Sequence, residues 1–413
     1  MARALEGMRV IQVGGGVAAG YGAKLLADLG ADVILVEPPG GDETRRFGPF
    51  PGDVPHSEKS GLFLYLNANK RGVTLDLEQP GDRSLLHRLL GDADLLMHAV
   101  PPAVMAAQGL DWETVHALNP RLVECSISRF GQTGPHRDFR GYELTSANAG
   151  GWATVTGAGP EGADLPPLKA FGQQADYQAG ANAAVASLGA LLARDLHRGT
   201  GAEPRSEGVG DPHGFPKSEQ VGQHIDLSIQ EVVMTFLEMT IVHNSYGHRV
   251  ASRLGGRIVQ PWAILAAKDG LVFLLCVQNA EWDRFVEWMG NPEWASWEIF
   301  DDRLKRSEAW DVLRPYIEEW TSRHTVEEIY TGGLQRKLAF APLSTMGDLL
   351  RNEHLRVRGF FATIGHPEAG ELEYPGAPWQ LGATPWELRT PAPLLGEHNE
   401  EILGALEKEA ARP

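Results

Sequence analysis

The sequence has little of what marks exported, membrane-embedded or disulfide-stabilised proteins. Only two of its 413 residues are cysteine. Both stand in strand-like apolar runs with no second thiol nearby, so we expect Cys125 and Cys276 to be buried and reduced. The longest apolar run, near residues 179–193, is shorter than the ~20 residues of a membrane-spanning helix, and glycines interrupt the N-terminal segment before a signal-peptide core develops. We therefore expect a cytoplasmic protein with no membrane partner.

Positive charge is also scarce. Lys and Arg number 37 against 54 Asp and Glu, which gives a net charge of −17. This balance argues against a nucleic-acid partner, and an anionic small ligand would need a locally basic pocket. The sequence lacks a Walker loop and the H-E-x-x-H, C-x-x-C and G-x-S-x-G motifs. The sequence therefore lacks the motifs that metal-dependent, phosphoryl-transfer and serine-hydrolase chemistry require, and we expect no metal site.

What is present first is an alternation of strand and helix signals. An α/β class follows, because strands that alternate with helices form a parallel sheet with helices on its faces. Strands are expected at 8–13, 31–37, 72–77, 94–100 and 122–128, with helices at 22–30 and 81–93 between them.

The chain divides into four segments by composition. A stretch rich in Gly, Pro and charge has no hydrophobic periodicity and is typical of a linker. After it, Ser228 and Glu231 form a capping box that begins a helix, and Asp269-Gly270 predicts a hairpin turn. We expect a large Rossmann-like domain over 1–196, a linker over 197–223, a smaller α/β domain over 224–335, and a tail over 336–413 that returns to the large domain.

The sharpest local pattern is a glycine-rich turn between the first strand and the first helix. Gly16, Gly20 and Gly22 precede Glu37, which ends the next strand, where an acid would bind ribose in a dinucleotide fold. A dinucleotide-dependent oxidoreductase is therefore one alternative, and a tight turn that needs small residues is the other. None of the eight tyrosines has Lys four residues on, so the Tyr-x-x-x-Lys pair of short-chain dehydrogenases is missing.

A single charge, Asp176, interrupts the stretch "AFGQQADYQAGANAAVASLGALLA". Burying a carboxylate is costly unless it caps, pairs or reacts. Asp is a preferred helix N-cap, and the following alanines and leucines predict a helix that ends near Arg194. A carboxylate held ionised at a helix start is also placed to act as a nucleophile, and the two interpretations are compatible.

Taken together, the segments resemble the class III CoA-transferase family, which includes formyl-CoA transferase, carnitine CoA-transferases and alpha-methylacyl-CoA racemase. The resemblance runs in family order over nearly the whole chain. Its pieces are "LEGMRVIQV", "KLLADLGADVILVEPPGGDETR", "NANKRGVTLDL", "FGQTGP", "GYELTSANAGG", the Asp176 segment, "HIDLSIQEVV", "DGLVFLLCV", "LRVRGFF" and "PAPLLGEHNEEIL".

The resemblance implies that Asp176 attacks an acyl-CoA thioester and passes through a mixed anhydride and an aspartyl-CoA thioester before a carboxylic acid takes the CoA. It also implies an interlocked homodimer. Racemases of the family use a histidine where this chain has Tyr142, and a phenol with a pKa near ~10 is a poor base at neutral pH, which favours the transferase. The positions implied to contact CoA are Val17, Ala18, Leu75, Asp76, Leu77, Arg140 and Tyr142.

The chain departs from the family pattern at several positions. Ala99, Val100 and Ala107 stand where many relatives hold CoA with other residues, Arg129 replaces a usual glycine, and a glycine-rich loop shrinks to residues 254–261. A CoA-binding protein without catalysis therefore stays an alternative. Basic residues that would compensate are more typical of solvated surface charges than of ligands; they are Lys24, Arg45, Arg46, Lys70, Arg71, Arg129 and Arg140.

Overall fold

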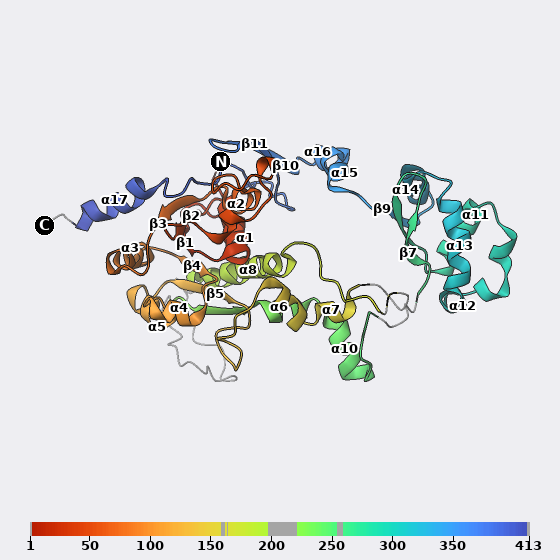
Figure 1. Ribbon diagram of the computed structural model, residues 1–413, viewed down its shortest axis with the longest axis horizontal. Coiled ribbons are helices and arrows are strands. Elements are labelled where there is room, and N and C mark those ends of the chain that lie inside the picture. The colour runs from red at the N-terminus through yellow and green to blue at the C-terminus, as the bar shows by residue number, and fades with distance from the viewer. Residues whose placement is uncertain (1, 158–161, 163, 197–220, 254–258, 411–413) are drawn as a thin grey trace. The chain divides into compact units, whose positions relative to one another are not determined.

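The computed structural model describes residues 2–157, 162, 164–196, 221–253 and 259–410 (Figure 1). The chain forms two compact units. The first comprises residues 1–158, 164–253 and 359–413, and the second comprises residues 159–163 and 254–358. Most of the expected linker 197–223 and most of the shortened loop 254–261 lie outside the described residues.

A six-stranded parallel sheet forms the centre of the first unit. Its strand order is β3-β2-β1-β4-β5-β6, which is the order of a doubly wound, Rossmann-like sheet. The predicted parallel sheet is thus confirmed. The strands are β1 (Arg9–Val13), β2 (Asp32–Glu37), β3 (Arg71–Thr74), β4 (Leu95–His98), β5 (Val123–Ser128) and β6 (His224–Ser228).

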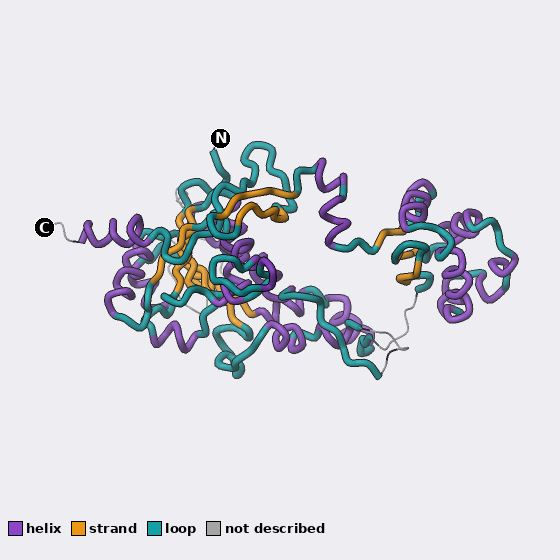
Figure 2. Tube along the Cα trace, turned by 45° about the horizontal axis from the view of Figure 1, so that its top comes forward, coloured by secondary structure: helices purple, strands orange, loops and turns teal. Residues whose placement is uncertain are grey.

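Helices cover both faces of this sheet, as Figure 2 shows for the strands gathered among helices. Successive residues of a strand point to opposite faces, so Val10 joins one apolar cluster with α1 and α8, whereas Ile11 joins another with α3 and α17. The helices of this unit are α1 (Gly16–Asp28), α2 (Gly61–Asn67), α3 (Pro80–Gly91), α4 (Pro102–Ala107), α5 (Trp112–Leu118), α6 (Glu143–Ala149), α7 (Trp152–Val155), α8 (Gln174–Leu196), α9 (Ile229–Thr235), α10 (Glu238–Gly247) and α17 (Asn399–Ala410), with short 3-10 turns η1 (Glu43–Arg46) and η2 (Pro51–Asp53).

Helices α1 and α8 pack against each other at close range, and they lie side by side in Figure 1. A Cβ atom on Gly180 would come within 2.5 Å of the carbonyl oxygen of Ala18, and one on Gly22 within 2.9 Å of the carbonyl oxygen of Gly180. Only glycine permits such an approach of two backbones. This packing places the first turn of α8 beside the first turn of α1.

The strand β6 and helix α9 were expected in the smaller domain, and that expectation is wrong. Ser228 pairs with Ser128 of β5, and Ile225 pairs with Cys125. One of the two hydrogen bonds of the predicted capping box is confirmed, since Ser228 Oγ accepts a hydrogen bond from Glu231 N at 3.3 Å. Residues 224–253 thus belong to the first unit because β6 completes the edge of its sheet.

The C-terminal segment packs on the first unit from residue 359 onward. Strands β10 (Phe361–His366) and β11 (Gly370–Pro375) form an antiparallel pair. Beyond them, Asn399 Oδ1 accepts a hydrogen bond from Thr74 N at 2.9 Å, which ties the start of α17 to β3. Residues 336–358, in contrast, lie in the second unit.

The second unit is built on an antiparallel sheet of order β7-β8-β9. The predicted turn at Asp269-Gly270 is confirmed, because Ala266 pairs with Leu271. Aromatic side chains fill its core, among them Phe285 and Trp320. Its elements are β7 (Trp262–Ala266), β8 (Leu271–Leu275), β9 (Ala339–Pro342), α11 (Asn279–Trp288), η4 (Glu293–Ser296), η5 (Glu298–Phe300), α12 (Arg303–Glu308), α13 (Trp310–Thr321), α14 (Val326–Gln335), α15 (Met346–Arg351) and α16 (Glu353–Val357).

Candidate functional site

Asp176 lies inside the first turn of α8, and the expectation that it is the N-cap is wrong. The helix begins two residues earlier, at Gln174. The capping acceptor is instead Glu143, whose Oε1 accepts a hydrogen bond from Ala175 N at 3.2 Å. The carboxylate of Asp176 is therefore not needed to close the helix start, although the helix dipole still favours negative charge there.

The partner of Asp176 is Arg129, the residue after β5. Its Nη1 and Nη2 atoms face the two carboxylate oxygens, with Nη2 at 3.3 Å from Oδ2, in a two-point ion pair. The side chain of Asp176 is 4% exposed, whereas that of Arg129 is 28% exposed. The carboxylate is thus buried, whereas the arginine that pairs with it is partly exposed to solvent.

A second carboxylate, Glu43, approaches the same place from the turn after β2. A Cβ atom on Gly16 would overlap the Glu43 carboxylate, so this carboxylate lies directly against the start of α1. Gly16 has φ of +53°, a conformation that glycine adopts without strain. Loops after β1, β2 and β5 therefore meet the start of α8 at the carboxyl edge of the sheet, where ligands bind in doubly wound folds.

The pKa of Asp176 is raised from its ordinary value, chiefly because burial disfavours the charged form, while Arg129 lowers it and Glu143 raises it. The pKa of Glu43 is raised as well, first by desolvation of its carboxyl and then by Asp42. Arg129 opposes the shift in both carboxyls. Arg129 is therefore a cation that favours the ionised form of both carboxyls.

The loop that leads into α8 is held by Lys169. Its Nζ lies 2.8 Å from Glu143 Oε2 and also donates to the carbonyl oxygen of Ala170 at 2.9 Å. Glu143 thus binds Lys169 with one carboxylate oxygen and caps α8 with the other. These contacts fix the position of Asp176 before any substrate arrives.

Comparison with known protein families identifies the family of this chain. The model of the group described as CoA-transferase family III matches residues 5–203 and 217–399. The chain belongs to CoA-transferase family III. As an enzyme, it is a class III CoA-transferase.

Relatives of the family III chain agree over nearly its full length. The succinyl-CoA:(R)-benzylsuccinate CoA-transferase subunit BbsE of Thauera aromatica is 32% identical over 394 residues, which are 93% of this chain and 90% of that protein. The succinyl-CoA–L-malate CoA-transferase alpha subunit of Chloroflexus aurantiacus is 31% identical over 406 residues, 97% of this chain and 88% of that one. A crystal structure of a CaiB/BaiF family protein from Brucella suis superposes with a TM-score of 0.83 at 25% identity, covering 98% of this chain and 100% of that chain.

The positions that the family resemblance implied for CoA contacts are spread along the same sheet. Val17 and Ala18 lie in the first turn of α1 with 3% exposure each, and Leu75 is buried just after β3. Arg140 and Tyr142 are exposed in the segment before α6, with Tyr142 79% exposed. Asp76 and Leu77, which follow Leu75, are partly buried. These assignments stay predictions.

Several basic residues expected on the surface are buried, so that expectation is wrong for them. Lys24 forms an ion pair with Asp28 at 2.8 Å. Lys70 donates to Gln12 Oε1, to the carbonyl oxygen of Gly20 and to Asn67 Oδ1, each at 2.8 Å. The Lys24 pair lies within α1, whereas Lys70 connects α1 to β1 and α2, since buried charges need such partners.

Glu37, the acid of the dinucleotide interpretation, is fully buried against Arg45. Nε and Nη2 of Arg45 lie 2.6 and 2.8 Å from the two carboxylate oxygens of Glu37, and Asp42 N donates to Glu37 at 2.8 Å. Both side chains are at most 1% exposed. This carboxylate is occupied by the fold itself and cannot serve a ribose, so the glycine turn is the tight structural turn.

Two further features are a set of three histidines, which could supply the base of a racemase, and the altered CoA segment after β4. His98, at the end of β4, lies 3.0 Å from Glu124 Oε1 and 2.8 Å from Ser126 Oγ within the sheet. His136 and His243 are exposed. The departures Ala99, Val100 and Ala107 follow β4, in the loop before α4 and at the end of α4.

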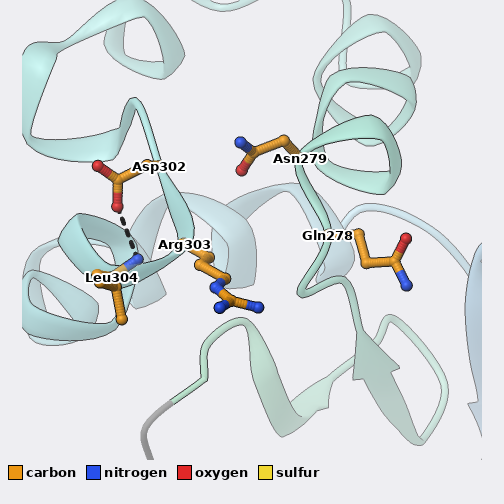
Figure 3. Close-up of a pocket in the computed structure, with 5 residues that line it drawn as sticks. All are labelled: Gln278, Asn279, Asp302, Arg303 and Leu304. Atoms are coloured by element: carbon orange, nitrogen blue, oxygen red, sulfur yellow. Dashed lines mark hydrogen bonds between the residues drawn. The ribbon is translucent and has the colours of Figure 1, made fainter.

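The second unit contains a weaker candidate for a functional site. A pocket of about 440 Å³ in the second unit lies between the starts of α11 and α12 (Figure 3). Asp302 there accepts a hydrogen bond from Leu304 N at 2.8 Å, and Asn279 Oδ1 accepts one from Arg306, so the polar groups of this pocket stabilise the fold.

Among the described residues, no cluster of His, Cys, Asp or Glu is arranged to hold a metal ion. Within the same residues, no helix combines the length and apolarity needed to cross a membrane.

Sequence reasoning missed Glu43, Glu143 and Lys169. Two of them stand in segments that carry the family resemblance, Glu43 in "KLLADLGADVILVEPPGGDETR" and Glu143 in "GYELTSANAGG", but neither segment shows what these carboxylates contact. Their roles appear only when the strand order brings distant loops together.

Both cysteines are buried and free as expected, and burial raises the pKa of each thiol to about 12.

Proposed function

We propose that this enzyme moves CoA from an acyl-CoA thioester to a carboxylic acid and that Asp176 is its nucleophile. The observation that carries the proposal is a buried carboxylate in the first turn of α8, paired with a reachable cation at the ligand-binding edge of the sheet. A carboxylate with a raised pKa is more basic and a better nucleophile, provided that it stays ionised.

Each step exchanges one acyl bond for another. A carboxylate oxygen of Asp176 attacks the thioester carbonyl, the C–S bond breaks, and CoA leaves as thiolate with the bonding electrons. The thiolate then attacks the Asp176 carbonyl carbon of the anhydride, and the donor acid leaves as a carboxylate. The incoming acid reverses both steps. Since a thioester is exchanged for a thioester, the sequence of steps needs no ATP and no metal.

We propose succinyl-CoA as the donor and a dicarboxylic acid as the acceptor, because both relatives described above are named for succinyl-CoA and for benzylsuccinate or malate. CoA is a substrate in this scheme. Val17, Ala18, Arg140, Tyr142 and the backbone of residues 75–77 are proposed to border it. We also propose a homodimer in the cytoplasm, and the two relatives named as subunits make the assembly worth measuring by light scattering.

The test is a search for the covalent intermediate. Wild-type enzyme incubated with succinyl-CoA and no acceptor should gain a CoA-sized mass on the peptide that contains Asp176, and hydroxylamine should remove it. Asp176→Asn is the matched control, because it keeps the size of the side chain but cannot form the adduct. The absence of any adduct on wild-type enzyme during turnover would contradict this mechanism.

A further inference from the structure

Arg129 and Asp176 satisfy each other in the free enzyme, and this raises a question for any reaction at Asp176. Both terminal nitrogens of Arg129 face the Asp176 carboxylate. Once that carboxyl becomes an anhydride or a thioester it is neutral, and the guanidinium loses its partner. A cation beside a low-dielectric surface is costly without a counter-charge.

The reaction supplies that counter-charge in the step after the anhydride has formed. When the aspartyl-CoA thioester forms, the donor acid is set free as a carboxylate next to the site. Before the return reaction, the acceptor acid enters as a carboxylate. One carboxylate is therefore available to Arg129 at each of these stages, first that of Asp176 and then that of the acid.

The geometry around Arg129 allows this exchange. Its side chain is 28% exposed, whereas that of Asp176 is 4% exposed, so Arg129 is the member of the pair that an acid can approach from solvent. A guanidinium binds a carboxylate through two parallel hydrogen bonds, as it does with Asp176 here. The other cation nearby, Lys169, is engaged with Glu143 at 2.8 Å.

We propose that Arg129 is the residue that binds the carboxylate of the acid substrate, and that Asp176 and this acid occupy the guanidinium in turn. This proposal rests on the proposed function. It names a site for the reacting carboxylate and predicts that free acid binds weakly while Asp176 is ionised. Acid should bind well only when Asp176 is neutral.

The experiment uses Asp176→Asn as a stable imitation of the neutral state. Binding of ¹³C-labelled succinate would be followed by NMR titration and calorimetry in the full-length enzyme. We expect Asp176→Asn to bind succinate about tenfold or more tightly than wild type, the scale of one charge-assisted carboxylate pair. The double variant Asp176→Asn/Arg129→Gln should return to the weak binding of wild type. Asp176→Asn/Arg323→Gln is the matched control, since Arg323 pairs with an acid on the surface of the second unit.

Three outcomes overturn the proposal. Equal succinate binding by Asp176→Asn and by its Arg129→Gln double variant shows that the guanidinium does not hold the acid. Loss of binding in the Arg323→Gln control shows a general charge effect. Tight binding that appears only after Glu43→Gln is added shows that Glu43 takes the guanidinium instead, since Glu43 also interacts electrostatically with Arg129. Each variant would be checked for native fold by circular dichroism.

The result separates this proposal from the proposed function. If wild-type enzyme forms the Asp176 adduct but the binding difference is missing, the nucleophile stands and the acid site falls. If the binding difference appears without any adduct, the acid site stands and the covalent mechanism falls.

Discussion

Two pairs of a carboxylate and an arginine lie at the same edge of the sheet, and they are built for opposite purposes. In the pair of Glu37 and Arg45, both side chains are at most 1% exposed. Arg45 also binds Glu58 at 2.6 Å and the carbonyl oxygen of Pro393 at 3.1 Å. These partners surround the guanidinium, so the pair connects β2 to distant loops and is not available to bind a ligand.

In the pair of Asp176 and Arg129, the guanidinium bonds to no second carboxylate among the described residues, and 28% of the arginine side chain is exposed. Burial raises the pKa of Asp176, which shows that the carboxylate is held at some cost. Glu37 with its enclosed arginine is therefore structural, whereas we expect Asp176 with its more exposed arginine to be available for reaction. Four predictions test that distinction.

The largest effect is expected from Asp176→Ala. Removing a nucleophile should lower kcat for CoA transfer by about 10³-fold or more, measured by the change in acyl-CoA composition. The melting temperature should fall only modestly, because Glu143 caps α8, the pKa of Asp176 is raised by folding, and the Arg129 left without its partner is partly exposed to water. With the pKa higher in the folded than in the unfolded chain, ionisation costs stability as pH rises through it, so losing this group costs the fold little. Activity within tenfold of wild type would remove Asp176 from the mechanism.

Breaking the enclosed pair should act on stability instead. Glu37→Gln leaves Arg45 buried with one carboxylate fewer and should lower the free energy of unfolding by about 3–5 kcal/mol, toward the lower end because Glu58 still pairs. Urea denaturation measures this loss. Transfer activity per folded molecule should be unchanged. A stable Glu37→Gln enzyme with lost NAD(H) binding would restore the dinucleotide interpretation of this turn.

The sequence predicted the central fold because its signals are local. The strand β2 has a continuous apolar run at its centre and β5 alternates apolar with polar residues, and the bounds of both lie within one residue of those expected. The strand β6 was assigned to the wrong unit, since His224 and Asp226 weaken its apolar pattern and residues 197–223 favour a boundary there. Only pairing with β5 reveals its place.

Of the candidate site, only Asp176, the proposed nucleophile, was singled out from the sequence. Asp176 was identifiable as a single charge in an apolar helix and through the family resemblance. Its partner Arg129 is 47 residues away in sequence, and Glu143, which caps α8, is 32 residues from Ala175. Such pairs depend on the order of the strands and not on spacing. Arg129 was one of seven basic candidates, and burial separated it from Lys24 and Lys70.

The third prediction concerns pH. Transfer needs ionised Asp176, so kcat/KM should rise with pH through the pKa of this group in the free enzyme. Arg129 lowers that pKa, and Arg129→Gln removes the lowering. The acidic limb of the profile should therefore move to higher pH in Arg129→Gln, with a smaller or absent move in Arg129→Lys, which keeps the charge. An unchanged limb in Arg129→Gln would show that the open pair does not tune the nucleophile.

The smallest effect is expected at Glu143, and its direction is opposite. Glu143 raises the pKa of Asp176, so Glu143→Gln should move the acidic limb of kcat/KM to lower pH. The amide keeps an oxygen that can accept from Ala175 N, so Glu143→Gln should lose little stability, whereas Glu143→Ala should lose about 0.5–2 kcal/mol with the cap. Lys169 loses its carboxylate partner in both variants but keeps the carbonyl oxygen of Ala170, so the difference between the variants reports chiefly on the cap. Shifts of the same sign in Glu143→Gln and Arg129→Gln would mean that the profile reports a group other than Asp176, since the two neighbours carry opposite charges toward the same carboxylate.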